Sequence, residues 1–159
     1  MKVLWAPWRM DFILRAREKS ASCIFCDLPK EKKSARNLVL HKGKRAFVIL
    51  NRYPYSNGHL MVVPSRHLAL VEGLNAVEHA ELGLLVGRSI KALKKAFNPG
   101  GFNIGLNMGR VAGAGIEDHV HYHVVPRWVG DASFMPVIGN ARVIPEAVKE
   151  TYRKLLKVF

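Results

Sequence analysis

Short runs of hydrophobic residues, each bounded by turn-forming residues, occupy the middle of the chain. Residues 37–51, NLVLHKGKRAFVILN, contain two such runs around a Lys-Gly turn, and residues 59–64, HLMVVP, form a third after Asn57-Gly58. Aliphatic runs of this length between turn residues are typical of strands. The pattern therefore predicts an antiparallel meander of three strands.

A longer segment, residues 75–97, has the spacing of a helix. Apolar residues recur on one helical face at Leu82, Leu85, Val86, Leu93 and Phe97. Asn75 suits the N-cap and Glu78, three residues on, suits a capping box. Cationic side chains favour the C-terminal end of a helix, which is where Lys91, Lys94 and Lys95 lie. The segment Asn98-Pro99-Gly100-Gly101 ends the predicted helix.

The rest of the chain alternates again and then returns to helical spacing. Residues 101–109, GFNIGLNMG, read as a strand, and Pro145 suits the first turn of a C-terminal helix. The apolar stripe of that helix is Val148, Tyr152, Leu155 and Phe159. Strands clustered around one long helix predict an α+β fold: an antiparallel or mixed sheet with the long helix packed on it and a helix at the C-terminus.

Length and composition predict one globular domain over residues 1–159. The chain is 49% hydrophobic and 23% charged, and its length suits a single core. Its apolar runs are much shorter than the roughly 20 residues that cross a bilayer. The N-terminal residues MKVLWAPWRMD lack the hydrophobic region of a signal peptide, so we expect a cytoplasmic location.

The charge of the chain favours anionic partners. It has 25 Lys and Arg against 12 Asp and Glu, a formal net charge of +13. A field of this sign attracts nucleic acid or a small polyphosphate. The basic residues are spread in short groups, so the charge does not choose between them.

Three histidines alternate in the segment EDHVHYHVVPRW, residues 117–128. In a strand, His119, His121 and His123 share one face, whereas a helix would scatter them because positions two apart differ by about 200°. The face could be a solvated polar surface or a metal site, since neutral imidazole is a common ligand. It could also supply a nucleophile, because a histidine with an ordinary pKa of about 6.5 is largely neutral near pH 7.

The two cysteines of the chain, Cys23 and Cys26, lie in the motif CIFC. This spacing suits two ligands of one metal ion and also a redox disulfide. The redox interpretation is disfavoured because no βαβ pattern follows the motif. A tetrahedral zinc would need two further donors.

The histidine segment resembles the His-x-His-x-His-x-x signature of the histidine triad family, with hydrophobic residues at x. A second block, NRYPYSNGHLMVVP at residues 51–64, is similar to the Asn-to-Gly-His segment of that family. LWAPWRM near the start, and residues 123–146 after the triad, resemble its bacterial diadenosine tetraphosphate phosphorylase branch.

The resemblance implies a nucleotidyl hydrolase or transferase acting on dinucleoside polyphosphates such as diadenosine tetraphosphate. His121 would attack the α-phosphorus and form a nucleotidyl-histidine intermediate, which phosphate or water would then release. His123 would contact phosphate, and His59 would hydrogen-bond the distal nitrogen of His121, directly or through a backbone link. Asn51 would contact ribose or phosphate, and Asn107 would lie near the α-phosphate.

Other substrate contacts are implied in the loops. Gly113 and Gly115 would let backbone N–H groups approach a phosphate closely. Residues 130–144 would form a loop over the substrate, from which Ser133 and Phe134 touch phosphate or base. The single domain would then comprise an N-terminal segment, a catalytic core, and a substrate loop with the C-terminal helix, at residues 1–35, 36–128 and 129–159.

The same resemblance implies a structural zinc and a homodimer. His67 and His119 match the positions that complete a four-ligand site with Cys23 and Cys26 in the zinc-bearing bacterial branch. His119 would then belong to the metal rather than to the chemistry. The dimer would form through the long helix and the adjoining strand. His41 and His79 match nothing in the family, and surface or packing roles are expected for them.

Two other classes of function stay open from the residues. One is a binding module for nucleic acid or a regulatory nucleotide, without turnover, motivated by the net charge. The other is a zinc hydrolase in which His119, His121 and His123 all bind the metal and water is the nucleophile. Cys23 and Cys26 disfavour the hydrolase because they offer the metal a separate place.

Overall fold

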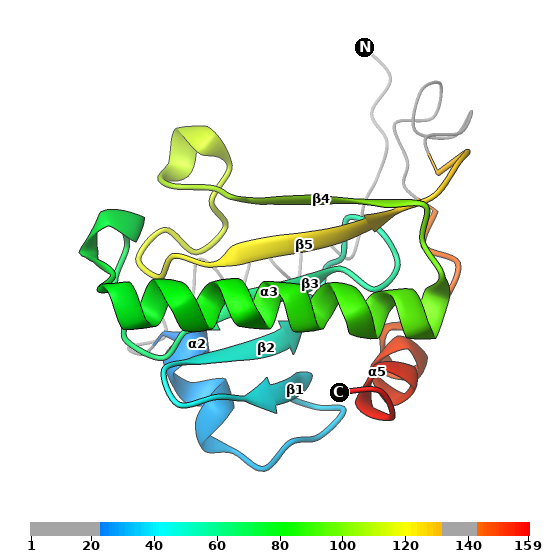
Figure 1. The fold of residues 1–159 in the computed structure, drawn as a ribbon, viewed down its shortest axis with the longest axis horizontal. Helices are drawn as coiled ribbons and strands as arrows, with labels where there is room; N and C mark the ends of the chain where they lie inside the picture. The colour runs from blue at the N-terminus through cyan, green and yellow to red at the C-terminus, as the bar shows by residue number, and fades with distance from the viewer. Residues whose placement is uncertain (1–22, 132–142) are drawn as a thin grey trace, which may run out of the picture.

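A single five-stranded antiparallel sheet, in the order β1-β2-β3-β5-β4, organises the protein (Figure 1). A computed structural model describes residues 23–131 and 143–159. The strands are β1 (Val39–Lys42), β2 (Ala46–Leu50), β3 (Leu60–Pro64), β4 (Gly101–Leu106) and β5 (Tyr122–Arg127). The predicted meander is β1 to β3. The fold class predicted from the sequence is confirmed.

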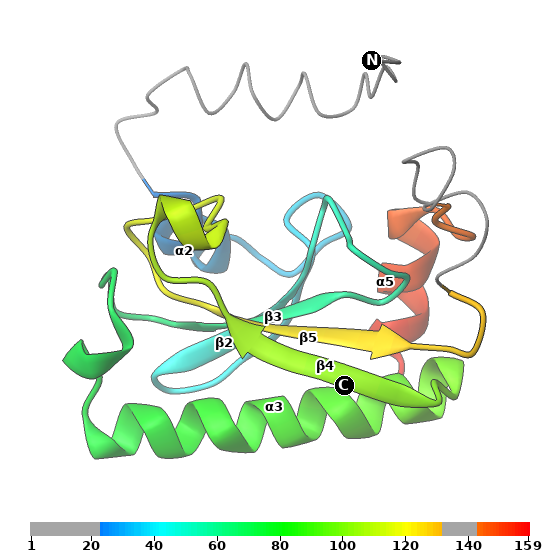
Figure 2. The same ribbon diagram turned by 90° about the horizontal axis from the view of Figure 1, so that it is seen from above.

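Helix α3 (Ala76–Phe97) covers one face of the sheet and carries the chain from β3 to the edge strand β4 (Figures 1 and 2). Strand β5 then returns between β3 and β4. Leu82, Leu85 and Leu93 of α3 are buried against strands whose own residues are almost all buried. The apolar stripe predicted from the sequence is therefore the surface that forms the main core.

The short helix α2 (Ile24–Asp27) and the 3₁₀ turn η1 (Leu28–Lys30) lie on the opposite face of the sheet, away from α3 (Figure 2). Phe25 of α2 is buried, with 1% of its surface exposed. Two further 3₁₀ turns, η2 (Val71–Gly73) and η3 (Arg110–Ala112), lie in the connections before α3 and β5. No helix among the described residues is long and apolar enough to span a membrane.

The C-terminal helix α5 (Val148–Leu156) packs at the β1 end of the sheet. Tyr152 is buried there, and its hydroxyl donates to the carbonyl of Val39 at 3.1 Å. The helix begins three residues after Pro145, so the predicted start is too early. Ala147, with extended backbone, is the N-cap.

Strand β5 also starts later than the sequence pattern indicates. It begins at Tyr122, so only His123 of the three histidines lies within a strand. His119 and His121 precede it in irregular backbone. The amide of Val120 donates to the carbonyl of Leu68 at 2.8 Å, outside the sheet, which ties this segment to the loop after β3.

The predicted capping box at the start of α3 is present and has a third partner. Asn75 Oδ1 accepts from the Glu78 amide, and the Glu78 carboxylate accepts from the Asn75 amide. Arg66 donates to both carboxylate oxygens, from Nε at 2.9 Å and Nη2 at 2.8 Å. Arg66 lies in the loop after β3, so this ion pair fixes that loop to the helix.

The hydrogen bond from the Arg66 guanidinium, together with the one from the Asn75 amide, lowers the pKa of Glu78 from 4.5 to about 2. Because the folded-state pKa is depressed, the ionised carboxylate stabilises the fold above pH 4.5, and this stabilisation is lost as pH falls toward 2. We expect Glu78→Gln to lower the free energy of unfolding above pH 5, and the deficit relative to wild type to shrink between pH 4.5 and 3. Urea unfolding of both proteins across this pH range measures the difference in their free energies of unfolding.

Glu72→Gln removes an exposed carboxylate from the preceding turn and is the matched control. If both variants gave the same pH-independent difference from wild type, the ion pair between Arg66 and Glu78 would not be the source of the effect.

Candidate active site and metal centre

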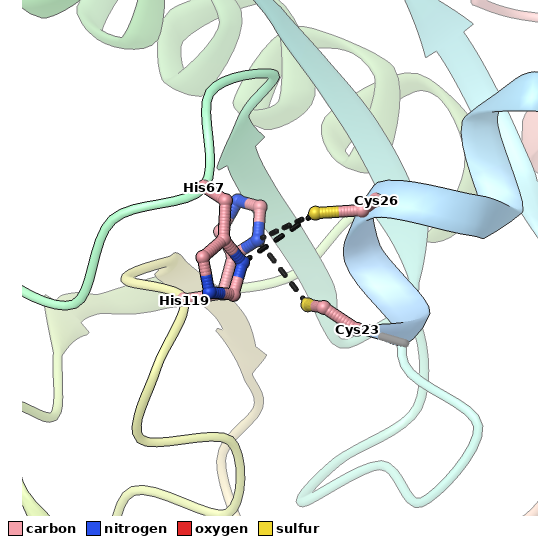
Figure 3. Close-up of side chains that lie close together, drawn as sticks. All are labelled: Cys23, Cys26, His67 and His119. Carbon is pink, nitrogen blue, oxygen red and sulfur yellow. Dashed lines mark hydrogen bonds between the residues drawn. The ribbon is translucent and has the colours of Figure 1, made fainter. Parts of the chain in front are cut away.

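Four side chains from three separate segments converge beside the sheet (Figure 3). Cys23 and Cys26 come from α2 and its N-cap, His67 from the loop after β3, and His119 from the segment before β5. Their ligand atoms all lie within 4.8 Å of one another. Among the described residues, this is the group of histidine, cysteine and carboxylate side chains that could hold a metal ion.

The distances in this cluster fit a tetrahedral ion. His119 Nδ1 lies 3.4 Å from Cys23 Sγ and 3.7 Å from Cys26 Sγ, and His67 Nδ1 lies 3.4 Å from Cys26 Sγ. Zinc bonds to sulfur and to imidazole nitrogen, with tetrahedral angles, give S···N edges of about 3.6 Å. Four protein donors would also close the coordination sphere, which is the arrangement of structural zinc sites.

The surroundings of the cluster favour the binding of a cation. His119 is fully buried, and its Nε2 donates to the carbonyl of Pro64 at 2.8 Å. This hydrogen bond leaves the lone pair of Nδ1 directed toward the thiols, as second-shell partners of metal ligands do. Burial raises the pKa of the Cys26 thiol, and the neighbouring Cys23 raises it further. A metal ion removes that repulsion between thiolates.

His121 lies next to this cluster but has a different environment. Its ring is buried and contacts Phe25, at 4.9 Å between ring centroids, and His123, at 4.8 Å. Its Nδ1 lies 2.9 Å from the carbonyl of His119. Because a carbonyl only accepts, Nδ1 must carry the proton in the neutral ring, and Nε2 must carry the lone pair. The lone pair on Nε2 is therefore available to attack an electrophile.

A second hydrogen-bonded chain fixes the tautomer of His123. The backbone amide of Tyr55 donates to His59 Nδ1 at 3.1 Å, so this nitrogen is an acceptor. His59, when neutral, therefore carries its proton on Nε2, which lies 2.9 Å from His123 Nδ1 and donates to it. The proton of neutral His123 is then on Nε2. That atom can donate to an anion.

His59 was expected to bond His121, and its partner is His123 instead. The sheet register explains the difference. Met61 of β3 pairs with His123 of β5, and His59 lies two residues before Met61 on the same face, which makes it a diagonal neighbour of His123. The distal nitrogen of His121, Nδ1, lies 2.9 Å from the carbonyl of His119.

Burial favours the neutral form of the three rings of His119, His121 and His123. It lowers the pKa of His123 to about 4, with a further contribution from His121, and it also lowers the pKa values of His121 and His119. Near neutral pH the cluster therefore offers lone pairs and N–H donors rather than positive charge.

The remaining predicted site residues lie in the adjoining loops. The Asn51 side chain accepts from the Tyr53 amide at 2.9 Å and lies 3.3 Å from His59 Nδ1, so it braces the loop that carries His59. Gly113 has a φ of +87°, and a Cβ added to it would lie 3.9 Å from the amide nitrogen of Asn107. The Gly113 amide donates to the carbonyl of Arg110, so it is already used within η3.

The expected substrate contacts of Asn51, Asn107 and Gly115 remain predictions. Ser133 and Phe134 lie outside the described residues. Outside the site, His41 lies 3.4 Å from Arg88, and His79 is exposed on α3.

Two aromatic residues of the site were missed by the sequence analysis. Phe25 packs on His119 and His121, and Tyr55 packs on His59 and His123 at 4.6 and 5.6 Å between ring centroids. Phe25 lies between the two cysteines of CIFC, and Tyr55 lies in the block that carries Asn51 and His59. Their position inside these two motifs could have identified them as residues of the site.

Comparisons with known proteins agree with this geometry. The family model described as HIT domain matches residues 32–129, more than half of the chain. The AP-4-A phosphorylase of Mycobacterium tuberculosis is 41% identical over 96% of this chain and 81% of its own. The adenosine 5'-monophosphoramidase of Schizosaccharomyces pombe is 35% identical over 67% of this chain and 74% of its own.

Solved structures give the same result. A crystal structure of a zinc-bound histidine triad family protein from Mycobacterium smegmatis superposes with a TM-score of 0.68 at 27% identity, covering 87% of this chain and 94% of that one. The matched family model, the 41% identical relative and the shared fold lead to one conclusion: this chain belongs to the histidine triad (HIT) family.

Proposed function

We propose that this protein is an enzyme of the histidine triad type that cleaves dinucleoside polyphosphates, such as diadenosine tetraphosphate, through a nucleotidyl group carried on His121. One observation carries the proposal: the buried His121 ring has its Nδ1 proton held by the His119 carbonyl, which leaves the Nε2 lone pair for attack. The relatives named as AP-4-A phosphorylase and bis(5'-adenosyl)-triphosphatase support this substrate class.

In the first step, a bond forms between His121 Nε2 and the α-phosphorus, and the bond from that phosphorus to the bridging oxygen breaks. The remaining nucleotide leaves with the bridging oxygen and the electron pair. In the second step, phosphate or water attacks the same phosphorus, and His121 is released as neutral imidazole once the acceptor has lost its proton. Two displacements replace one difficult step, which is the advantage of covalent catalysis.

His123 supports both steps as a neutral donor. Its Nε2–H, set by the chain from Tyr55 through His59, would hydrogen-bond a phosphoryl oxygen that gains charge in the transition state. The lowered pKa of His123, about 4, means that this proton is held by a neutral ring at pH 7. The field of the +13 charge would draw the polyphosphate toward the protein.

Rapid quenching of a reaction with labelled diadenosine tetraphosphate should leave acid-labile label on His121. His121→Ala should abolish the label and reduce turnover by roughly 10³-fold or more, because the nucleophile is removed. Mass analysis of the quenched protein locates the label. His79→Ala, an exposed histidine on α3, is the control and should retain both label and turnover. Label persisting in His121→Ala would refute the assignment.

The same reaction identifies the acceptor when it is run with and without inorganic phosphate. ADP plus ATP formed only with phosphate indicates phosphorolysis, which the 41% identical AP-4-A phosphorylase favours. AMP plus ATP in both conditions indicates hydrolysis. Tight, steeply salt-dependent polynucleotide binding with no products in either condition would instead support the binding-module alternative.

The metal centre is proposed to hold zinc. Cys23, Cys26, His67 and His119 provide the soft and imidazole donors that zinc prefers, and a structural ion there would tie α2 to the loop after β3 and to the segment before β5. The use of His119 in this cluster also disfavours a zinc hydrolase built on all three histidines.

Protein purified without chelator should contain about one zinc per chain. Cys23→Ser should lose it and lower the melting temperature by at least roughly 2 to 4 °C, the shift that about 1 kcal/mol produces in a domain of this size. Elemental analysis and thermal unfolding measure the two effects. His41→Ala, outside the cluster, should keep the metal. Absence of metal from wild type would remove the proposal.

A homodimer through β4 is also proposed. Within the described part of the chain β4 pairs on one side only, with β5, and Ile104 on this edge strand is 46% exposed. An open strand edge is a template for pairing with a second copy.

Light scattering after size exclusion should give twice the chain mass for wild type and the chain mass for Ile104→Asp, because a carboxylate placed on the contact would be desolvated by pairing. Val111→Asp changes a fully exposed residue on η3 and should remain dimeric. A monomeric wild type would contradict the dimer.

A further inference from the structure

Phe25 is the residue that joins the metal cluster to His121. It lies between Cys23 and Cys26 in α2 and is 1% exposed. Its ring meets the His119 ring at 5.5 Å with an interplanar angle of 80°, and the His121 ring at 4.9 Å and 59°. One side chain therefore contacts both a candidate metal ligand and the candidate nucleophile.

The helix that carries Phe25 is short, so its position depends on contacts with the core and with the cluster. α2 contains only four residues, and its N-cap, Cys23, makes no side-chain capping hydrogen bond. A single turn of helix is not stable by itself, because ordering its backbone costs more free energy than its first hydrogen bond provides. The amides of Cys26 and Asp27 donate to the carbonyl of Cys23, so the turn that closes the pair of thiols also sets the direction of Phe25.

The His121 ring has two aromatic neighbours of different kinds. One is His123, which is fixed by His59. The other is Phe25, which supplies van der Waals contact but no hydrogen bond. The hydrogen bond from Nδ1 to the His119 carbonyl sets the ring plane, and that carbonyl belongs to a residue of the metal cluster. Two routes thus connect the cluster to the nucleophile.

We infer that Phe25 is a positioning residue for His121, and that metal binding by the Cys23–Cys26 turn orients the nucleophile by pressing Phe25 against its ring. This inference rests on the proposed function for its consequence in turnover. Its structural content, that the metal and Phe25 together fix the His121 ring, holds whatever the substrate is.

The first test compares Phe25→Leu with Phe47→Leu. Phe47 of β2 is equally buried, and its ring lies against Phe25 at 6.5 Å, so both variants lose the same volume from the same cluster. Imidazole ¹⁵N spectra of the zinc-loaded proteins should show His121 as the single Nδ1–H tautomer in wild type and in Phe47→Leu, but as a mixture in Phe25→Leu. Zinc content should be unchanged in both.

Single-turnover measurements give the second readout. In Phe25→Leu the rate of nucleotidyl transfer to His121 should fall roughly 10- to 100-fold, the scale expected when a reacting group is misplaced. Substrate affinity should change by less than about 2-fold, because only the nucleophile has moved. Phe47→Leu should change neither value by more than about 2-fold. A loss of affinity with an unchanged transfer rate would overturn the positioning role.

The third test measures coupling between the metal and Phe25. Chelation of wild type should produce the same mixed His121 tautomers and the same slower transfer, and zinc should restore both. Chelation of Phe25→Leu should add little, because the link is already broken, so the two effects should be non-additive. If chelation slowed transfer in Phe25→Leu by the same factor as in wild type, the metal would not act through Phe25.

The outcomes separate this inference from the proposed function. Mixed His121 tautomers in Phe25→Leu without any turnover in wild type would support the positioning and reject the substrate assignment. A labelled His121 with a transfer rate and tautomer insensitive to Phe25→Leu would do the reverse. If chelation unfolds the protein, the comparison of Phe25→Leu with Phe47→Leu, both zinc-loaded, decides the positioning role by itself.

Discussion

The structure of this site depends on how His119 uses three of its polar groups. Nδ1 faces the two thiols, Nε2 donates to the Pro64 carbonyl, and its own carbonyl accepts the Nδ1 proton of His121. The residue is fully buried, so each of these groups must have a partner. A change in any one would move the other two. The metal cluster, the strand β3 and the nucleophile are therefore linked through one residue.

The hydrogen-bond directions in the rest of the site follow from backbone groups whose roles are fixed. The Tyr55 amide can only donate and the His119 carbonyl can only accept, and from these two groups the protons of His59, His123 and His121 are determined in turn. Imidazoles alone would have several tautomers of similar energy. The Tyr55 amide selects the tautomers of His59 and His123, and the His119 carbonyl separately selects that of His121. The result is a lone pair on His121 and a donor on His123.

The sequence predicted the parts of this arrangement that depend on local spacing. The cap of α3 could be predicted because Asn75 and Glu78 are three residues apart, and the strands could be predicted from their apolar runs. The four members of the metal cluster were inferred from resemblance, since Cys26 and His67 are 41 residues apart and no spacing rule joins them. The pairing of His59 with His123 depends on the register of β3 against β5, which the sequence alone does not specify. Phe25 was missed because a four-residue helix is too short to show periodicity.

The neutral site and the strongly positive chain have complementary roles. Burial removes charge from His119, His121 and His123, so these rings cannot attract a polyphosphate by their own charge. The net charge of +13 can attract it from a distance, but a field summed over many dispersed residues does not select one orientation of a phosphoryl group. Orientation must come from short-range donors with fixed directions, of which His123 Nε2–H is one. A charged imidazole at position 121 would attract the substrate better, yet it would have no lone pair with which to attack. The fold therefore separates attraction from attack: the dispersed basic residues supply the first, and the buried neutral histidines supply the second.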